Sequence, residues 1–180
     1  MIEHDGPQAA HRRIAAAMMY AIEKHWHQRR RDGTPYIAHP IRVAECLRRI
    51  GGVDDPDVII AALLHDSIED TDCEWDDLDK RFGRRVADLV ATLSGDMRMP
   101  KPERRTEVIE RARTAPREAQ AIRLADRLDN LLDMSGFSQA RKEEYVDGSE
   151  KTLAACRGAN PALEAAMAAA IAKVRAELQA

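Results

Sequence analysis

The chain has 180 residues and a formal net charge of −3, and 33% of its residues are charged. This length fits one globular domain with a single core, and the lack of a basic excess argues against a nucleic-acid polymer as partner. Aromatic residues make up only 4%, so the core must be built from aliphatic side chains. A composition rich in Ala and Leu, with few β-branched runs, favours helices.

Apolar residues recur at helical spacing along most of the chain, and no segment has the pattern of a strand. Glycine and proline residues divide the pattern into successive helices. The expected helices span residues 11–30, 37–50, 56–70, 75–82, 84–93, 103–112, 117–132, 140–156 and 162–178. We therefore expect an all-α protein, a compact helical bundle in one domain (1–180). Its core should lie at about 11–165, and its C-terminal helix at about 162–178.

The expected helix at 56–70 changes character along its length. Asp55 is a suitable N-cap and Pro56 a suitable first residue. Residues 58–64 are apolar on nearly all sides, so this part should be central to the core. Four ionisable residues follow at the end of the helix: His65, Asp66, Glu69 and Asp70. Because residues four apart share a helix face, each of the first two should lie near one of the last two.

Imidazole nitrogen and carboxylate oxygen are good ligands for a divalent first-row metal, so His65 and Asp66 are candidate ligands. A bound cation would also offset the cost of charged groups at the end of an apolar helix. His39 and Asp126 are further candidates on other expected helices, and Asn130 lies one turn after Asp126. Mixed nitrogen and oxygen ligands favour manganese, iron or zinc over magnesium.

The three cysteines, Cys46, Cys73 and Cys156, are far apart and form no CxxC pair. This spacing argues against a disulfide framework and against a thiolate zinc site. The first residues are polar where a signal peptide would need an apolar stretch, and no apolar run has the length of a transmembrane helix. We expect a cytoplasmic protein with reduced thiols and no membrane partner.

One histidine, an adjacent His-Asp pair and a distant aspartate, all on helices, together resemble the HD-domain phosphohydrolases. Three segments resemble more narrowly the hydrolase domain of the RelA/SpoT family: GTPYIAHP at 33–40, AALLHDSIEDT at 61–71 and LADRLDN at 124–130. Two shorter segments, FGRRV at 82–86 and PKPERR at 100–105, are similar as well. The resemblance spans about residues 15–165, and the length matches the stand-alone branch, the small alarmone hydrolases.

This resemblance implies an HD-type helical bundle that removes the 3′-pyrophosphate from guanosine tetra- or pentaphosphate, leaving GDP or GTP. The usual metal of the family is manganese, Mn²⁺, and the motifs imply four ligands: His39, His65, Asp66 and Asp126. They imply Glu69 and Asp70 as the catalytic pair that handles the attacking water and the proton transfer. The nucleotide substrate would be contacted by Arg30, which packs on the base, and by Lys101, Asn130 and Tyr145.

The sequence departs from the family pattern at two positions. Asp129 stands where many long members have a His, and His27 stands where they often have Gly. Two alternatives remain open. The same site could hydrolyse another nucleotide, such as NADPH, a deoxynucleoside triphosphate or a nucleoside monophosphate. A non-catalytic scaffold could also keep this fold, although it would be expected to lose metal ligands or the pair Glu69-Asp70.

Overall fold

The computed structural model describes residues 6–134 and 136–179, which form ten helices and no strand. The helices are α1 (Pro7–Lys24), α2 (Ala38–Arg49), α3 (Pro56–Leu63), α4 (Ser67–Asp70), α5 (Trp75–Phe82), α6 (Arg84–Leu93), α7 (Lys101–Ala112), α8 (Arg117–Leu132), α9 (Gln139–Ala155) and α10 (Pro161–Gln179). The predicted all-α class is confirmed. In the described part of the chain, no helix has the length and apolar character needed to cross a membrane.

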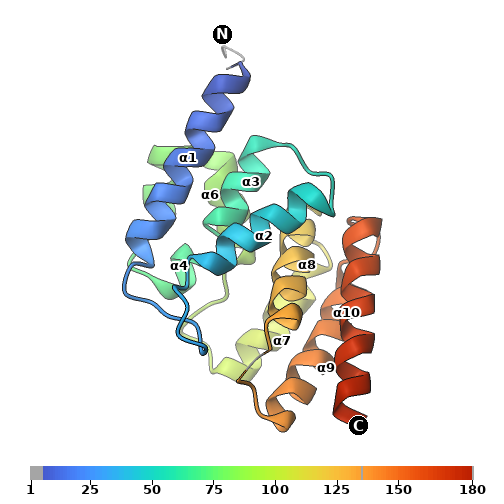
Figure 1. Ribbon diagram of the computed structural model, residues 1–180. Coiled ribbons are helices and arrows are strands. Elements are labelled where there is room, and N and C mark those ends of the chain that lie inside the picture. The colour runs from blue at the N-terminus through green and yellow to red at the C-terminus, as the bar shows by residue number, and fades with distance from the viewer. Residues whose placement is uncertain (1–5, 135, 180) are drawn as a thin grey trace.

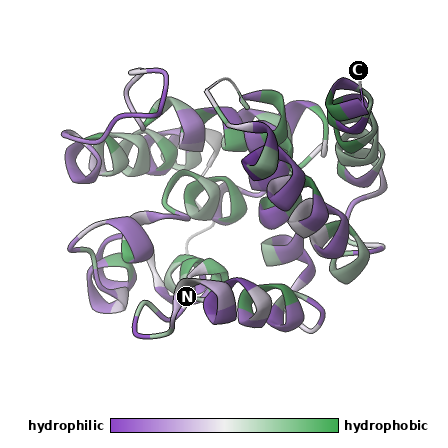
Figure 2. Cartoon of the chain, turned by 90° about the horizontal axis from the view of Figure 1, so that it is seen from below, coloured by the Kyte–Doolittle hydropathy of each residue, from purple (hydrophilic) through white to green (hydrophobic). Residues whose placement is uncertain are grey.

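The helices pack around one cluster of buried aliphatic side chains (Figure 1). The N-terminal helix α1 and the C-terminal helix α10 lie on opposite sides of this bundle. Helix α2 crosses between them and packs on both α3 and α8, while α10 covers α8 and α9. Figure 2 shows the chain coloured by hydropathy: hydrophobic helix sides (green) face one another, and hydrophilic sides (purple) face outward. This packing therefore brings α2, α3 and α8, which come from distant parts of the chain, into contact with one another.

Helix α3 is the central helix, as its apolar sequence predicts. It packs on α1, α2, α6 and α8. Every residue from Val58 to Leu63 is buried, and burial of each large aliphatic side chain contributes about 1.5–3 kcal/mol. Asp55 caps the helix, since its carboxylate accepts a 3.0 Å hydrogen bond from the backbone N–H of Asp57. The residues that follow α3 are thus attached to a helix that is buried in the core.

The prediction of one continuous helix from Pro56 to Asp70 is wrong. Helix α3 ends at Leu63, residues 64–66 form a turn, and the short helix α4 follows. The side chain of His65 explains the break: its Nδ1 lies 2.8 Å from the carbonyl oxygen of Ala62, which the next helical turn would otherwise use. His65 and Asp66 consequently project from a turn, and the argument from four-residue helical spacing does not apply to them.

The predicted first helix, 11–30, is also corrected, because α1 ends at Lys24. Helices in proteins are stabilised mainly by packing of an apolar face, and the last apolar residue of this stretch, Trp26, is 64% exposed. The chain instead turns back on itself through a 2.8 Å hydrogen bond from Arg30 N–H to the Thr34 carbonyl. Gly33 has a φ of 89° in this turn, a region that favours glycine. Arg30 therefore lies in a loop that reaches α8.

Candidate metal centre

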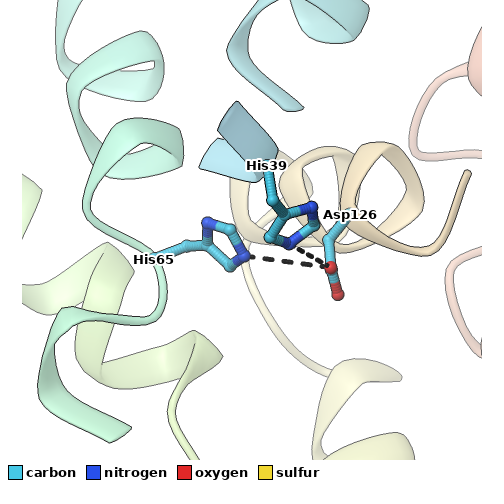
Figure 3. Close-up of side chains that lie close together, drawn as sticks. All are labelled: His39, His65 and Asp126. Carbon is cyan, nitrogen blue, oxygen red and sulfur yellow. Dashed lines mark ion pairs between the residues drawn. The ribbon is translucent and has the colours of Figure 1, made fainter. Parts of the chain in front are cut away.

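Three of the four predicted metal ligands form a tight group: His39 from α2, His65 from the turn after α3, and Asp126 from α8 (Figure 3). One ligand atom of each lies within 4.8 Å of the others. Asp126 Oδ1 is 3.2 Å from His39 Nε2 and 3.8 Å from His65 Nε2. The fold therefore brings together positions that are far apart in the sequence.

The fourth predicted ligand, Asp66, joins the same group. Its Oδ2 lies 3.0 Å from His65 Nε2 and 3.7 Å from His39 Nε2. Two imidazole nitrogens and two carboxylates thus face a common point, a donor set that suits a divalent first-row metal. We call these four residues the His/Asp cluster.

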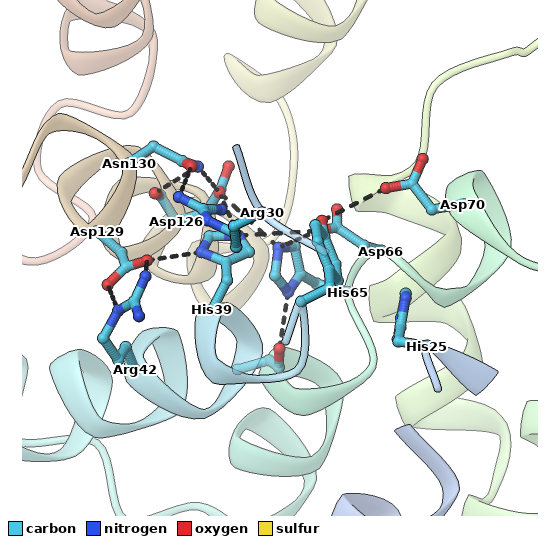
Figure 4. Close-up of polar contacts among 12 residues, drawn as sticks. His25, Arg30, His39, Arg42, His65, Asp66, Asp70, Asp126, Asp129 and Asn130 are labelled. Carbon is cyan, nitrogen blue, oxygen red and sulfur yellow. Dashed lines mark hydrogen bonds and ion pairs between the residues drawn. The ribbon is translucent and has the colours of Figure 1, made fainter. Parts of the chain in front are cut away.

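Both imidazole rings are held so that Nε2 points into the cluster (Figure 4). His65 Nδ1 bonds to the Ala62 carbonyl, which only accepts, so Nδ1 carries the proton. His39 Nδ1 lies 2.7 Å from Asp129 Oδ2. His65 Nε2 is buried and, although it lies 3.0 Å from Asp66 Oδ2, it has no hydrogen bond of suitable geometry among the described residues. Buried polar atoms normally have a partner, and a metal ion bound here would provide one, so the cluster fits a metal.

The charges within the cluster also favour a bound cation. Burial opposes ionisation of Asp66 and Asp126, but the nearby histidines outweigh it and lower the pKa of both carboxyls. Burial likewise opposes protonation of His65, yet the two aspartates raise the pKa of its imidazole to about 9. Without metal, the carboxylates are therefore balanced by protonated histidine. A divalent cation would take over that balance and release the proton.

The predicted catalytic pair, Glu69 and Asp70, lies on α4 beside the cluster. Burial raises the pKa of each carboxyl, and the negative charge of Asp66 raises it further. Glu69 faces the same cavity as the cluster, with its Oε1 3.8 Å from Arg104 Nε. The Tyr36 hydroxyl donates to Asp66 and lies 3.4 Å from Asp70 Oδ2. The two acids therefore differ in surroundings, and Glu69 is the one on the cavity wall.

The cluster opens into a cavity of about 870 Å³, a size typical of small-molecule sites. Three of the predicted substrate residues line it: Arg30, Asn130 and Tyr145. The side chain of the fourth, Lys101, is outside what the structure describes. Six arginines from α7, α8 and α9 and the turn after α7 also line the cavity, and we call them the basic wall: Arg104, Arg105, Arg113, Arg123, Arg127 and Arg141. Such a surface suits a highly anionic ligand.

Several site residues are absent from the sequence-based prediction. Tyr36 lies in the segment GTPYIAHP, which assigns it no role, although its hydroxyl contacts Asp66. The sequence motifs also do not identify most arginines of the basic wall. Arg123 and Arg127 are four residues apart on α8, between residues that are buried. Charged residues on the buried side of an amphipathic helix are the sequence signal that identifies them.

Comparison with known proteins gives a consistent result. A family model described as HD domain matches residues 17–157. The chain is similar to the guanosine-3′,5′-bis(diphosphate) 3′-pyrophosphohydrolase MESH1 of Danio rerio, at 41% identity over 152 residues, covering 81% of this chain and 84% of that protein. The Homo sapiens protein of the same name is 39% identical over 169 residues, covering 90% and 93%. The similarity therefore extends over nearly the full length of these small relatives.

Solved structures support the same relationship. The structure of a protein described as a metazoan ortholog of SpoT that hydrolyses ppGpp aligns with a TM-score of 0.86 at 36% identity, covering 89% of this chain and 94% of that chain. A Listeria monocytogenes protein aligns with a TM-score of 0.66 at 32% identity, covering 79% and 98%. The arrangement of the helices is thus shared with known structures.

Proposed function

This chain belongs to the HD-domain family, and we propose that it hydrolyses guanosine 3′,5′-bis(diphosphate) and the matching pentaphosphate to pyrophosphate and GDP or GTP. The observation that carries the proposal is that the His/Asp cluster and the basic wall face one cavity. A substrate with phosphate groups at both its 3′ and 5′ positions suits a site that has a cation centre and a separate set of arginines. The proposed activity is also the one that the small relatives carry in their names.

In the proposed reaction, water attacks the phosphorus bonded to O3′, the P–O3′ bond breaks, and pyrophosphate leaves while O3′ gains a proton. His39, His65, Asp66 and Asp126 would hold the metal. When bound, a divalent cation supplies positive charge to the phosphate oxygens and lowers the pKa of its water. The arginines of the basic wall add positive charge on the other side of the cavity.

Glu69 and Asp70 handle the protons. Glu69 lines the cavity, and its raised pKa suits it to take a proton from the attacking water. Asp70 lies within reach of the Tyr36 hydroxyl, which also donates to Asp66. We assign to Asp70 the return of a proton toward O3′ by way of the Tyr36 hydroxyl, which lines the cavity, so that one acid removes a proton and the other supplies one.

Arg30, Asn130 and Tyr145 hold the nucleotide. Arg30 is a planar cation at the cavity wall and suits stacking on a guanine base. Burial raises the pKa of Tyr145 to about 12, so its hydroxyl stays protonated and can donate a hydrogen bond. Lys101 is the first residue of α7, the helix that also carries Arg104 and Arg105. We propose that Lys101 is a further substrate contact.

The test is metal-dependent release of pyrophosphate by the purified protein, which is first freed of metal and then supplied with Mn²⁺. A substrate panel should contain the tetraphosphate, the pentaphosphate, dGTP, GMP and NADPH. We expect release of pyrophosphate from the two guanosine alarmones, and none from the tetraphosphate without metal. Turnover of dGTP, GMP or NADPH with no release from the alarmones would refute the proposal.

We propose Mn²⁺ as the native metal, because two nitrogen and two oxygen ligands favour a transition metal over magnesium and manganese is the usual metal of the family that the motifs resemble. Reloading the metal-free protein with Mn²⁺, Zn²⁺, Fe²⁺ or Mg²⁺ should give the highest rate with Mn²⁺. We also propose that the protein works in the cytoplasm. All three of its cysteines are free thiols, as expected in a reducing compartment, and cell fractionation would test this location.

A further inference from the structure

We propose that Asp129, clamped by Arg42, is a positioning residue that fixes the imidazole of His39 for metal binding. The inference rests on the proposed metal site, but it assigns a role to two residues that the ligand motif does not include. Asp129 lies on α8, one turn after Asp126, and Arg42 lies on α2, one turn after His39. The two helices that supply metal ligands therefore also supply the positioning pair.

The contact between Asp129 and His39 determines which ring nitrogen is available to a metal. Asp129 is only 3% exposed, and its Oδ2 lies 2.7 Å from His39 Nδ1. A carboxylate only accepts hydrogen bonds, so His39 Nδ1 carries the proton. The Nε2 atom then faces Asp126 Oδ1 at 3.2 Å. A carboxylate behind a metal-binding histidine both orients the ring and makes its free nitrogen a better ligand.

Arg42 keeps the Asp129 carboxylate in place and balances its charge. Its Nε donates to Asp129 Oδ1 at 2.6 Å and its Nη2 donates to Oδ2 at 3.0 Å (Figure 4). Such bidentate pairs fix both the position and the orientation of a carboxylate. Asp129 would otherwise add a third negative charge beside Asp66 and Asp126. With Arg42 in place, Asp129 can remain an ionised acceptor close to the cluster.

A purely structural role is the competing explanation, since an ion pair between α2 and α8 could simply join the two helices. The ion pair of Asp57 with Arg13 provides a matched control. Asp57 Oδ1 lies 2.6 Å from Arg13 Nη2, and its other oxygen lies 3.3 Å from Arg85 Nη1. Asp57 therefore also has two basic partners, but it lies at the start of α3, away from the cluster.

The experiment measures Mn²⁺ affinity directly, by calorimetric titration of the metal-free protein. The variants are Asp129→Asn, Arg42→Gln and the control Asp57→Asn. We expect Asp129→Asn to weaken Mn²⁺ binding about 10- to 100-fold and Arg42→Gln to weaken it by a smaller factor. Asp57→Asn should lower the Tm but leave Mn²⁺ affinity unchanged. Pyrophosphate release by Asp129→Asn should fall at limiting Mn²⁺ and recover with excess Mn²⁺, a rescue that a structural role does not predict.

Wild-type Mn²⁺ affinity in folded Asp129→Asn would overturn the inference. If that variant does not fold, Arg42→Gln decides in the same way, since the side chain of Arg42 is 37% exposed and its replacement leaves the core intact. The two proposals also fail separately. A wild-type protein that binds Mn²⁺ but releases no pyrophosphate would refute the proposed function, while the Mn²⁺ titrations would still decide the role of Asp129.

Discussion

Arg30 donates a 3.1 Å hydrogen bond to the side-chain oxygen of Asn130, although 100 positions separate them in the sequence. Asn130 in turn donates a 2.7 Å hydrogen bond to Asp126 Oδ1. The side-chain amide of Asn130 thus links Arg30, which is proposed to contact the base, to Asp126, a proposed metal ligand. This link should help to place the nucleotide relative to the cluster.

Replacement of Arg30 should therefore weaken substrate binding more than it weakens metal binding. We expect Arg30→Ala to raise KM about tenfold, equivalent to about 1.4 kcal/mol, because the cation on the base side of the site is lost. Mn²⁺ affinity should stay near the wild-type value. Steady-state kinetics with the tetraphosphate would measure the change, with Arg12→Ala, on the exposed side of α1, as the control. An unchanged KM would contradict the assignment.

Removal of a proposed metal ligand should abolish activity without unfolding the protein. In Asp66→Ala the cluster loses the carboxylate that lies 3.0 Å from His65 Nε2. We expect no measurable Mn²⁺-dependent pyrophosphate release and an intact helical circular dichroism spectrum. Asp54→Ala, which removes an exposed acid, should behave as wild type. Undiminished hydrolysis by Asp66→Ala would refute the ligand assignment.

The pH dependence of hydrolysis should reflect Glu69. Burial and the charges of Asp66 and Asp70 raise its pKa, and the proposed base must be ionised. Activity should therefore fall as the pH falls and Glu69 takes up a proton. Glu69→Gln should lower kcat about 10²- to 10⁴-fold and flatten this acid limb. A wild-type pH profile in the variant would exclude Glu69 as the base.

Glu69 should also lower the stability of the metal-free protein. Its folded-state pKa is raised, so the folded state favours the protonated carboxyl, and ionisation above the unfolded pKa costs folding free energy. Glu69→Gln removes that ionisation, and we expect a higher Tm at pH 7 together with the loss of activity. Thermal unfolding of metal-free samples would show it, and a lower Tm would contradict the argument.

Tyr36 should matter for catalysis although the sequence motif gives it no role. Its half-buried hydroxyl donates to Asp66 and lies close to Asp70. A hydrogen bond to a charged group contributes about 1.5–3 kcal/mol, so Tyr36→Phe should lower kcat/KM about 10- to 100-fold. Tyr20→Phe is a matched control, because the Tyr20 hydroxyl contacts Cys73, away from the cluster. Equal rates for both variants would remove Tyr36 from the mechanism.

The sequence predicts the helices well where an apolar face is continuous. Helices α5, α6 and α8 have the expected bounds because their buried residues recur at regular spacing. It fails at the end of α3, where a side-chain contact from His65 to the Ala62 carbonyl stops the helix. It fails again after Lys24, where burial rather than local propensity decides the length of α1.

The site shows the same limit. Residue type and motif spacing single out the His/Asp cluster, and the fold brings its four members together. The contact of Asp129 with His39 depends on how α2 packs on α8, which no local pattern reveals. From the sequence, Asp129 is only a departure from the family pattern. The basic wall is likewise assembled from three helices and a turn, so its arginines resemble surface residues when each is considered alone.

The wide spacing of the cluster along the chain has a consequence for the kinetics of folding. Its members come from positions 39, 65–66 and 126, and they meet only when α2 has docked on both α3 and α8. A cation can therefore bind tightly only after the slow closure of these long loops. Interactions absent from the folding transition state act on the unfolding rate. Chelation should thus shorten the lifetime of the native state while leaving the refolding rate unchanged, as stopped-flow measurements with and without Mn²⁺ would show.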